Sequence, residues 1–324
     1  MTKHFFNNTL PSIEDPDFKL LPDMPKPEFM LIGAAKSGTT SFSSYLPIHP
    51  QVKNCRVKEP NYWSWKLCNR QQYQSMFVNP IPLISPRSNQ QIGGEYSTSY
   101  LLNPLVPRRV RACLPDTKII ILLRNPIDRA YSHFIMSQRQ GMEPIRTFHE
   151  IVEKEIEEIS TLLDAHRRGF LDPDYRTSAH RSTPEGIPIS VAEHNATWTQ
   201  HRLLTDKELF RFYGTSYVFR SIYHDQVWRW LQLFPQNQIK VIESERLFNE
   251  RKEIMSEVIG FLNLQPFEFN SDQLQHTWGG GASNYKKPGS YAPMKEKTRI
   301  LLGDFFSPYN ESLFNLIEED FNWN

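Results

Sequence analysis

The chain has 324 residues, of which 39% are hydrophobic and 23% are charged. This length fits one large domain, and the hydrophobic share is enough for an ordinary globular core. The formal net charge is only +1, which excludes a bulk electrostatic attraction to nucleic acid or to an anionic membrane surface, so neither is expected as a partner. A phosphate-rich ligand would need basic residues that gather locally.

The cysteines and the hydropathy of the chain bear on its compartment. Cys55, Cys68 and Cys113 are an odd number with no C-x-x-C pair, which favours a reducing environment over a disulfide framework. Cysteines and histidines show no metal-ligand spacing, so no metal is expected. No run of eighteen apolar residues and no signal-type N-terminal segment is present, and we therefore expect a cytoplasmic protein.

In chain order, strands alternate with helices. Residues 1–27 are rich in proline and predict an extended segment ahead of a single domain at 28–324. The apolar run at 29–33 ends in glycine and predicts a buried strand, and residues 39–46 predict the helix after it. The later elements are strands at 91–95, 118–123 and 239–242, and helices at 104–114, 125–138, 148–168, 218–234, 251–262 and 308–320.

The strand at 118–123 is apolar on both faces, as a central strand of a parallel sheet is. Strand and helix alternation predicts an α/β domain, with a parallel sheet flanked by helices. Residues 140–216 show no strand pattern between two core helices, and we interpret them as a helical and loop insertion.

The first strand runs into the segment GAAKSGTTS at residues 33–41. Glycines let backbone N–H groups turn toward an anion, and the helix N-terminus adds donors and a favourable dipole. Lys36 supplies a cation. The further candidate ligands of a phosphate group are Ser37, Gly38, Thr39, Thr40 and Ser41. The alternative is a turn between strand and helix that binds nothing.

The loop departs from the motif of phosphate-transferring ATPases and kinases. In that motif, G-x-x-x-x-G-K-[ST], the lysine follows the second glycine, whereas Lys36 precedes Gly38. The best strand ends in Leu123-Arg124 and not in the aspartate that would hold magnesium. A P-loop small-molecule kinase therefore stays as an alternative, less favoured function.

A second anion site is predicted at the end of the strand at 118–123. Arg124 lies at its carboxyl end, where open α/β sheets bind ligands, and Ser132 follows two helical turns later. A guanidinium and a hydroxyl group can converge on one phosphate. Two phosphate sites on one sheet fit a ligand phosphorylated at two positions. The alternative is a structural ion pair at Arg124 and a surface serine.

These two segments resemble the nucleotide motifs of the sulfotransferases that use 3′-phosphoadenosine 5′-phosphosulfate (PAPS), and most closely the heparan sulfate N- and 3-O-sulfotransferase branch. The motifs are residues 33–41 and LLRNPIDRAYS at 122–132. Further segments similar to that branch are VPRRV at 106–110, LFPQNQI at 233–239, FFSPYN at 305–310 and FNW at 321–323. The resemblance implies a P-loop-like sulfotransferase fold and PAPS-dependent transfer, EC class 2.8.2. The other alternative is a nucleotide-binding module without catalysis.

The resemblance also implies roles for single residues. Lys36 and its loop would bind the 5′-phosphosulfate, and Arg124 with Ser132 the 3′-phosphate. Glu59, in KEPNYW at 58–63, matches the family's glutamate and is the candidate catalytic base beside Lys36; from spacing alone it reads as a solvated carboxylate. Further nucleotide contacts would come from Tyr223 of an R-S-x-Y segment and from Lys286 and Lys287 of a late basic loop.

Departures from the family bear on the acceptor. A lysine that lies in the substrate cleft of the polysaccharide enzymes is replaced by Tyr96 in GEYSTSY at 94–100. The family's disulfide and membrane anchor are also missing, which again favours the cytoplasm. We expect a hydroxyl or amine of a small molecule, natural product or saccharide as the acceptor, with residues 140–216 covering the acceptor side.

Overall fold

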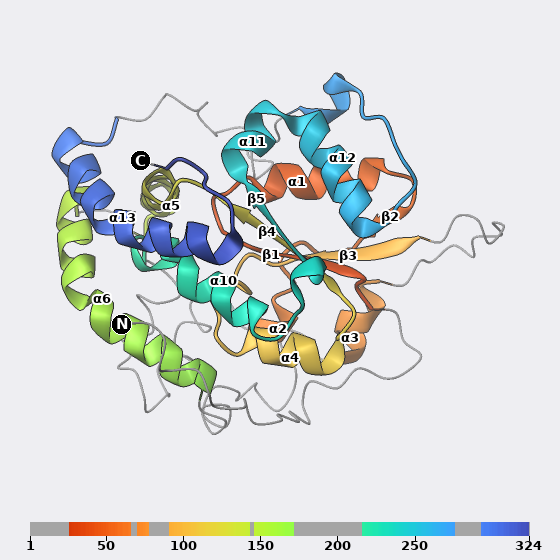
Figure 1. Cartoon of the computed structure of the whole chain (residues 1–324), viewed down its shortest axis with the longest axis horizontal. Helices are drawn as coiled ribbons and strands as arrows, with labels where there is room; N and C mark the ends of the chain where they lie inside the picture. Colours follow the sequence, from red (N-terminus) through yellow and green to blue (C-terminus); the bar gives the residue numbers. More distant parts are fainter. Residues whose placement is uncertain are drawn as a thin grey trace.

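The computed structural model describes residues 26–65, 70–77, 91–142, 146–171, 216–275 and 293–323. At its centre lies a parallel five-stranded sheet in the order β2-β3-β1-β4-β5 (Figure 1). The strands are β1 Phe29–Gly33, β2 Val52–Asn54, β3 Ile92–Tyr96, β4 Lys118–Leu123 and β5 Ile239–Glu243. The predicted α/β class, a parallel sheet flanked by helices, is confirmed.

Helices cover both faces of the sheet and one end of it (Figure 1). One face carries α1 Thr39–Tyr45, α11 Ser244–Asn249 and α12 Arg251–Leu262. The other carries α2 Tyr62–Trp65, α3 Arg70–Ser75, α4 Val106–Cys113 and α10 Tyr223–Leu231. A third apolar cluster joins α5 Pro126–Arg139, α6 Phe148–Leu171, the short 3-10 helix Phe219–Ser221 and α13 Glu296–Ile317.

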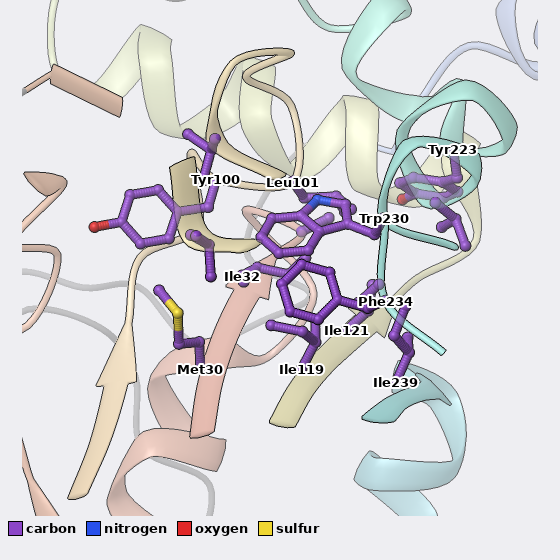
Figure 2. Close-up of a cluster of buried hydrophobic side chains, with 14 of the residues drawn as sticks. Met30, Ile32, Tyr100, Leu101, Ile119, Ile121, Tyr223, Trp230, Phe234 and Ile239 are labelled. Carbon is purple, nitrogen blue, oxygen red and sulfur yellow. The ribbon is translucent and has the colours of Figure 1, made fainter. Parts of the chain in front are cut away.

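The central strands β1 and β4 are buried on both faces. Successive side chains of a strand point to opposite sides, and an apolar cluster covers each side of the sheet. Met30 and Ile32 of β1 pack toward Trp230 of α10, as Figure 2 shows. Phe29 and Leu31 pack on the opposite face, under α1 and α12. The apolar run at 118–123 behaves in the same way, which confirms its assignment as a central strand.

Two predicted helices differ from the structure. The helix predicted at 218–234 is divided at Ile222, which has a ψ of 88°. Its first turn is held by tertiary bonds, since Ser221 Oγ donates to Pro126 O and accepts from Arg129 Nε. The helix predicted at 308–320 begins twelve residues earlier, at Glu296, and runs through Pro308. Pro308 is exposed, so water can satisfy the carbonyl group that its missing N–H leaves free.

The predicted proline-rich segment and most of the predicted insertion lie outside the described residues, namely 1–25, 143–145 and 172–215. Within the insertion, α6 confirms the helix predicted at 148–168. Its residues Phe148, Ile151 and Ile159 are buried in the third apolar cluster.

Gly94 of β3 lies opposite Phe29 of β1, and a Cβ at position 94 would lie 2.1 Å from the Phe29 ring. Gly94→Ala should therefore lower the free energy of unfolding by about 1–3 kcal/mol through overpacking. The matched control is Gly260→Ala in α12, where a Cβ meets nothing within 4 Å. It should be neutral or stabilising by up to about 1 kcal/mol. Denaturant unfolding of both variants measures the difference, and equal stability of Gly94→Ala and wild type would contradict it.

Candidate anion-binding site

The loop between β1 and α1 is shaped for an anion. Gly38 has a φ of 83°, in the left-handed region that favours glycine, and precedes the first residue of α1. The first N–H groups of a helix have no partner within it and can donate to an anion. Ser37 Oγ is buried and has no hydrogen-bond partner among the residues that the structure describes. The side chains of Thr39 and Ser41 are also buried, whereas Thr40 is half-buried and reachable.

Lys36 is surrounded by other positive charges. Burial lowers its pKa first, and four neighbouring cations lower it further, to about 8. With Lys36 they form what we call the cation cluster: Lys36, Lys58, Arg124, Arg129 and Arg139. Cations this close repel one another in the free protein. An anion bound among them would offset both the repulsion and the desolvation of the Lys36 ammonium group.

Arg124 lies where the sequence predicted it, at the carboxyl end of β4, and its Nη1 donates to Lys36 O at 3.2 Å. The neighbouring ends of β1 and β4 therefore bring the two predicted anion sites together. Tyr223 is buried, and its hydroxyl group donates to Arg124 O at 2.9 Å. Tyr223, which was predicted to contact the nucleotide, therefore supports the backbone of Arg124, a predicted phosphate ligand.

Helix α5 turns one stripe of side chains toward the loop. Arg129 Nη1 donates to Ala35 O at 3.5 Å, and Met136 Sδ lies 3.6 Å from Lys36 Nζ. Ser132 is three residues after Arg129 and four before Met136, so it occupies the same face of the helix. Ser132 is half-buried. The structure thus places the predicted pair, Arg124 and Ser132, on one side of the loop.

Glu59 lies at the same edge of the sheet, beside β3. Its carboxylate accepts from Thr98 N at 2.8 Å and from Thr98 Oγ1 at 3.1 Å, and Glu59 N donates to Tyr96 O. The preceding Lys58 donates from Nζ to Thr40 Oγ1 of α1 at 2.7 Å. Lys58 thereby connects the segment that carries Glu59 to the phosphate loop.

The environment of Glu59 suits proton transfer. Burial raises its pKa, and the hydrogen bonds from Thr98 and the charges of Lys58 and Arg220 act in the opposite direction. A half-buried carboxylate with a raised pKa beside cations is a candidate general base. The solvated loop carboxylate that spacing alone favoured is not what the structure shows.

The remaining residues of interest are buried or lie outside the described residues. Tyr96 is buried, its hydroxyl group donates to Asn54 Oδ1 at 2.5 Å and its ring meets Phe29 edge-on, so it does not line the anion site. His133, which directly follows Ser132, is buried, and its Nδ1 has no hydrogen-bond partner in the described part of the chain. Lys286 and Lys287 lie outside the described residues.

Sequence reasoning missed residues that fix the site. Arg129 reads as a surface residue of α5 beside Asp128 but is buried and ties three segments together. Thr98 gave only a weak signal, a run of hydroxyl residues directly after β3. Its role depends on Glu59, which lies 39 residues earlier in the chain. In the described part of the chain, no group of three or more His, Cys, Asp or Glu is placed to hold a metal ion.

Among solved structures, a sulfotransferase from Alicyclobacillus acidocaldarius is similar in fold. The TM-score is 0.59 at 23% sequence identity, and the match covers 92% of this chain and 98% of that one. The parallel sheet and its flanking helices are therefore arranged as in that structure.

Curated relatives are similar over most of this chain. Membrane-associated sulfotransferase kil1 of Dictyostelium discoideum is 25% identical over 92% of this chain and 66% of its own length. Human bifunctional heparan sulfate N-deacetylase/N-sulfotransferase 2 is 25% identical over 90% of this chain and 29% of its own length. Human heparan sulfate glucosamine 3-O-sulfotransferase 6 is 23% identical over 92% of this chain and 73% of its own length. The predicted resemblance to the heparan sulfate branch is confirmed.

The expectation of a cytoplasmic protein is wrong, because the Dictyostelium relative that matches 92% of this chain is membrane-associated. The expectation rested on hydropathy, and a spanning helix is only one of several ways in which a protein attaches to a membrane. None of the described helices has the length and apolar character needed to cross a bilayer.

A family model described as "Sulfotransferase domain" matches residues 26–280. The matched range contains the phosphate loop, Glu59 and the segment from Arg124 to Ser132, which the fold brings to one edge of the sheet. This chain belongs to the sulfotransferase domain family.

Proposed function

We propose that the protein transfers the sulfuryl group of PAPS to a hydroxyl or amine group of a saccharide or small-molecule acceptor. The observation that carries this proposal is the cation cluster around Lys36 next to a candidate base, Glu59, at the carboxyl edge of the sheet. The cation cluster fits a ligand with several negative charges, and Glu59 fits an acceptor that must lose a proton.

PAPS would bind as a substrate with its two charged ends at the two predicted sites. The loop N–H groups, Lys36 and Thr40 suit the 5′-phosphosulfate, and Arg124 with Ser132 suits the 3′-phosphate. Lys286 and Lys287 remain predicted contacts of the nucleotide. The bound anion would restore a full positive charge to Lys36, since it offsets the neighbouring cations.

The reaction is an in-line displacement at sulfur. The acceptor oxygen or nitrogen forms a bond to sulfur, while the bond between sulfur and the 5′-phosphate oxygen breaks and leaves its electron pair on that oxygen. Glu59 takes the proton of the acceptor, and adenosine 3′,5′-bisphosphate leaves. Lys36 and the loop donors stabilise the negative charge that develops on the leaving oxygen.

Relatives support a saccharide among the possible acceptors, because several are named for heparan sulfate or as carbohydrate sulfotransferases. The side chain of Tyr96 points into the core and not toward the site, so Tyr96 itself does not contact the proposed acceptor. The role of residues 140–216 as a cover on the acceptor side remains a prediction.

Lys36→Ala should lower the rate of sulfuryl transfer by about a hundredfold or more, because it removes a charge that stabilises the leaving group. Exposed Lys53 on β2 provides the matched control, Lys53→Ala, which should transfer at the wild-type rate. Transfer from labelled PAPS to a panel of saccharides, alcohols and amines measures both. A folded Lys36→Ala variant with the wild-type rate would contradict the role of Lys36.

Glu59→Gln should keep its affinity for adenosine 3′,5′-bisphosphate and lose roughly 10²- to 10⁴-fold in kcat, because the amide cannot accept the acceptor's proton. The matched control is Glu253→Gln, an exposed carboxylate on α12. Calorimetric binding and the transfer assay separate the two effects. Unchanged kcat in Glu59→Gln would remove Glu59 from the role of base.

The affinity for adenosine 3′,5′-bisphosphate should fall as the pH rises through about 8. The pKa of Lys36 is about 8 in the free protein, and a bound anion raises it, so binding is coupled to proton uptake above that pH. Lys36→Arg keeps its charge at these pH values and should show a flatter profile. Calorimetry from about pH 7 to about pH 9.5 tests this; parallel profiles for the two proteins would contradict it.

A further inference from the structure

The carboxylate of Glu95 is fully buried at the end of β3 and has no part in the proposed reaction. Three hydroxyl groups donate to it. Tyr73 donates to Oε2, and Tyr100 and Ser97 donate to Oε1. Three hydroxyl donors on one buried carboxylate make a closed polar network inside the apolar core that lies under α2 and α4.

The direction of each bond in this network is fixed by N–H groups of residues 61–63. Asn61 N donates to Ser97 Oγ, Trp63 N to Tyr100 OH, and Trp63 Nε1 to Tyr73 OH. An N–H group can only donate in these bonds, so each hydroxyl oxygen accepts one hydrogen bond and donates its own hydrogen to Glu95.

All three hydroxyl groups therefore donate to one carboxyl group, and its ionised form is the better acceptor for them. Burial raises the pKa of Glu95 to about 7, and the hydrogen bonds from Tyr100, Tyr73 and Ser97 lower it. The hydroxyl groups thus favour the form of Glu95 that their own orientation requires.

Residues 61–63 are continuous with Glu59. We call residues 59–64 the base segment; it runs beside residues 96–100. Glu59 and Asn61 have φ values of 58° and 51°, a left-handed conformation that non-glycine residues adopt at a cost and hold only when surrounding contacts fix them. Besides the Thr98 bonds of Glu59, Ser99 Oγ donates to Asn61 Oδ1 at 2.6 Å.

We propose that Glu95 is a positioning residue for the catalytic base: through Ser97, Tyr100 and Tyr73 it holds Asn61 and Trp63, and thereby fixes the base segment that carries Glu59. The proposal rests on the proposed role of Glu59 in sulfuryl transfer. In the described part of the chain, the hydroxyl groups that donate to Glu95 belong to Tyr73 of α3 and to Ser97 and Tyr100, and all three accept from the base segment. None of them belongs to the phosphate loop or to the cation cluster. Its effect should therefore fall on the chemical step and not on nucleotide binding.

Glu95→Gln is the first test. The glutamine amide brings a donor where an acceptor is needed, so at least one hydroxyl group loses its partner. A displacement of about 1 Å at the base can cost on the order of a hundredfold in rate. We expect kcat to fall by about 10- to 100-fold at saturating PAPS, with an unchanged Kd for adenosine 3′,5′-bisphosphate.

Tyr100→Phe is a milder second variant, which removes the acceptor of Trp63 N and one donor to Glu95. It should lower kcat in the same direction. Thr298→Val is the control, since Thr298 is also buried and its hydroxyl group bonds to His149 Nδ1, between α13 and α6. Wild-type kcat in folded Glu95→Gln and Tyr100→Phe, or an equal loss of bisphosphate affinity, would overturn the proposal.

A double variant separates positioning from general destabilisation. Adding Glu95→Gln to Glu59→Gln should lower kcat no further, because the group that Glu95 positions is already absent. A further fall of the same size would show that Glu95 acts elsewhere and would overturn the proposal.

Amide hydrogen exchange gives a readout that needs no turnover. The N–H groups of Asn61 and Trp63 should exchange faster in Glu95→Gln than in wild type, while amides of β4 stay protected. Unchanged exchange would overturn the positioning role. If wild type transfers sulfuryl to no acceptor while the variant exchanges faster, the proposed function fails and the coupling of Glu95 to residues 61–63 stands.

Discussion

Positive charges crowd the loop after β1, and the groups that hold them there are largely uncharged. Arg124 and Arg129 donate to the carbonyl oxygens of Lys36 and Ala35. Carbonyl groups orient a guanidinium group without cancelling its charge, so the attraction for an anion is kept. Burial is the first cause of the low pKa of Lys36, and the neighbouring cations lower that pKa further. A multiply charged anion is the ligand that relieves this repulsion.

In the proposed reaction, the two sides of the sheet edge have separate tasks. The cations gather at the ends of β1 and β4, where α5 connects this edge to the turn at 219–221. These cations suit the charged ends of the donor. The end of β3 holds Glu59 through Thr98 and, below it, the carboxylate of Glu95. Lys58 joins the two sides, since its ammonium group reaches Thr40 of α1. Donor binding and proton removal can therefore be altered independently.

Glu59 and Glu95, the two carboxylates near the end of β3, have different surroundings that suit different roles. Both have raised pKa values because of burial. Glu59 is half-buried, and its carboxylate accepts from the backbone and hydroxyl group of Thr98, an arrangement that suits a group that meets an acceptor. Glu95 is enclosed and fully engaged by hydroxyl donors, which suits it to hold a structure in place.

The sequence by itself determined the features that depend on near neighbours in the chain. The strands at 29–33 and 118–123, the glycine turn at residue 38, the order of the two nucleotide motifs and the family could all be read from local patterns, because strand burial and loop geometry follow from adjacent residues.

Only the tertiary structure decided which distant residues meet. It set Glu59 against Thr98, buried Arg129 against the loop, turned Tyr96 into the core and divided the predicted helix at Ile222. The physical reason is strand register and helix docking: they select the face on which a side chain lies and its partner across the sheet, and neither is encoded in the spacing of a single segment.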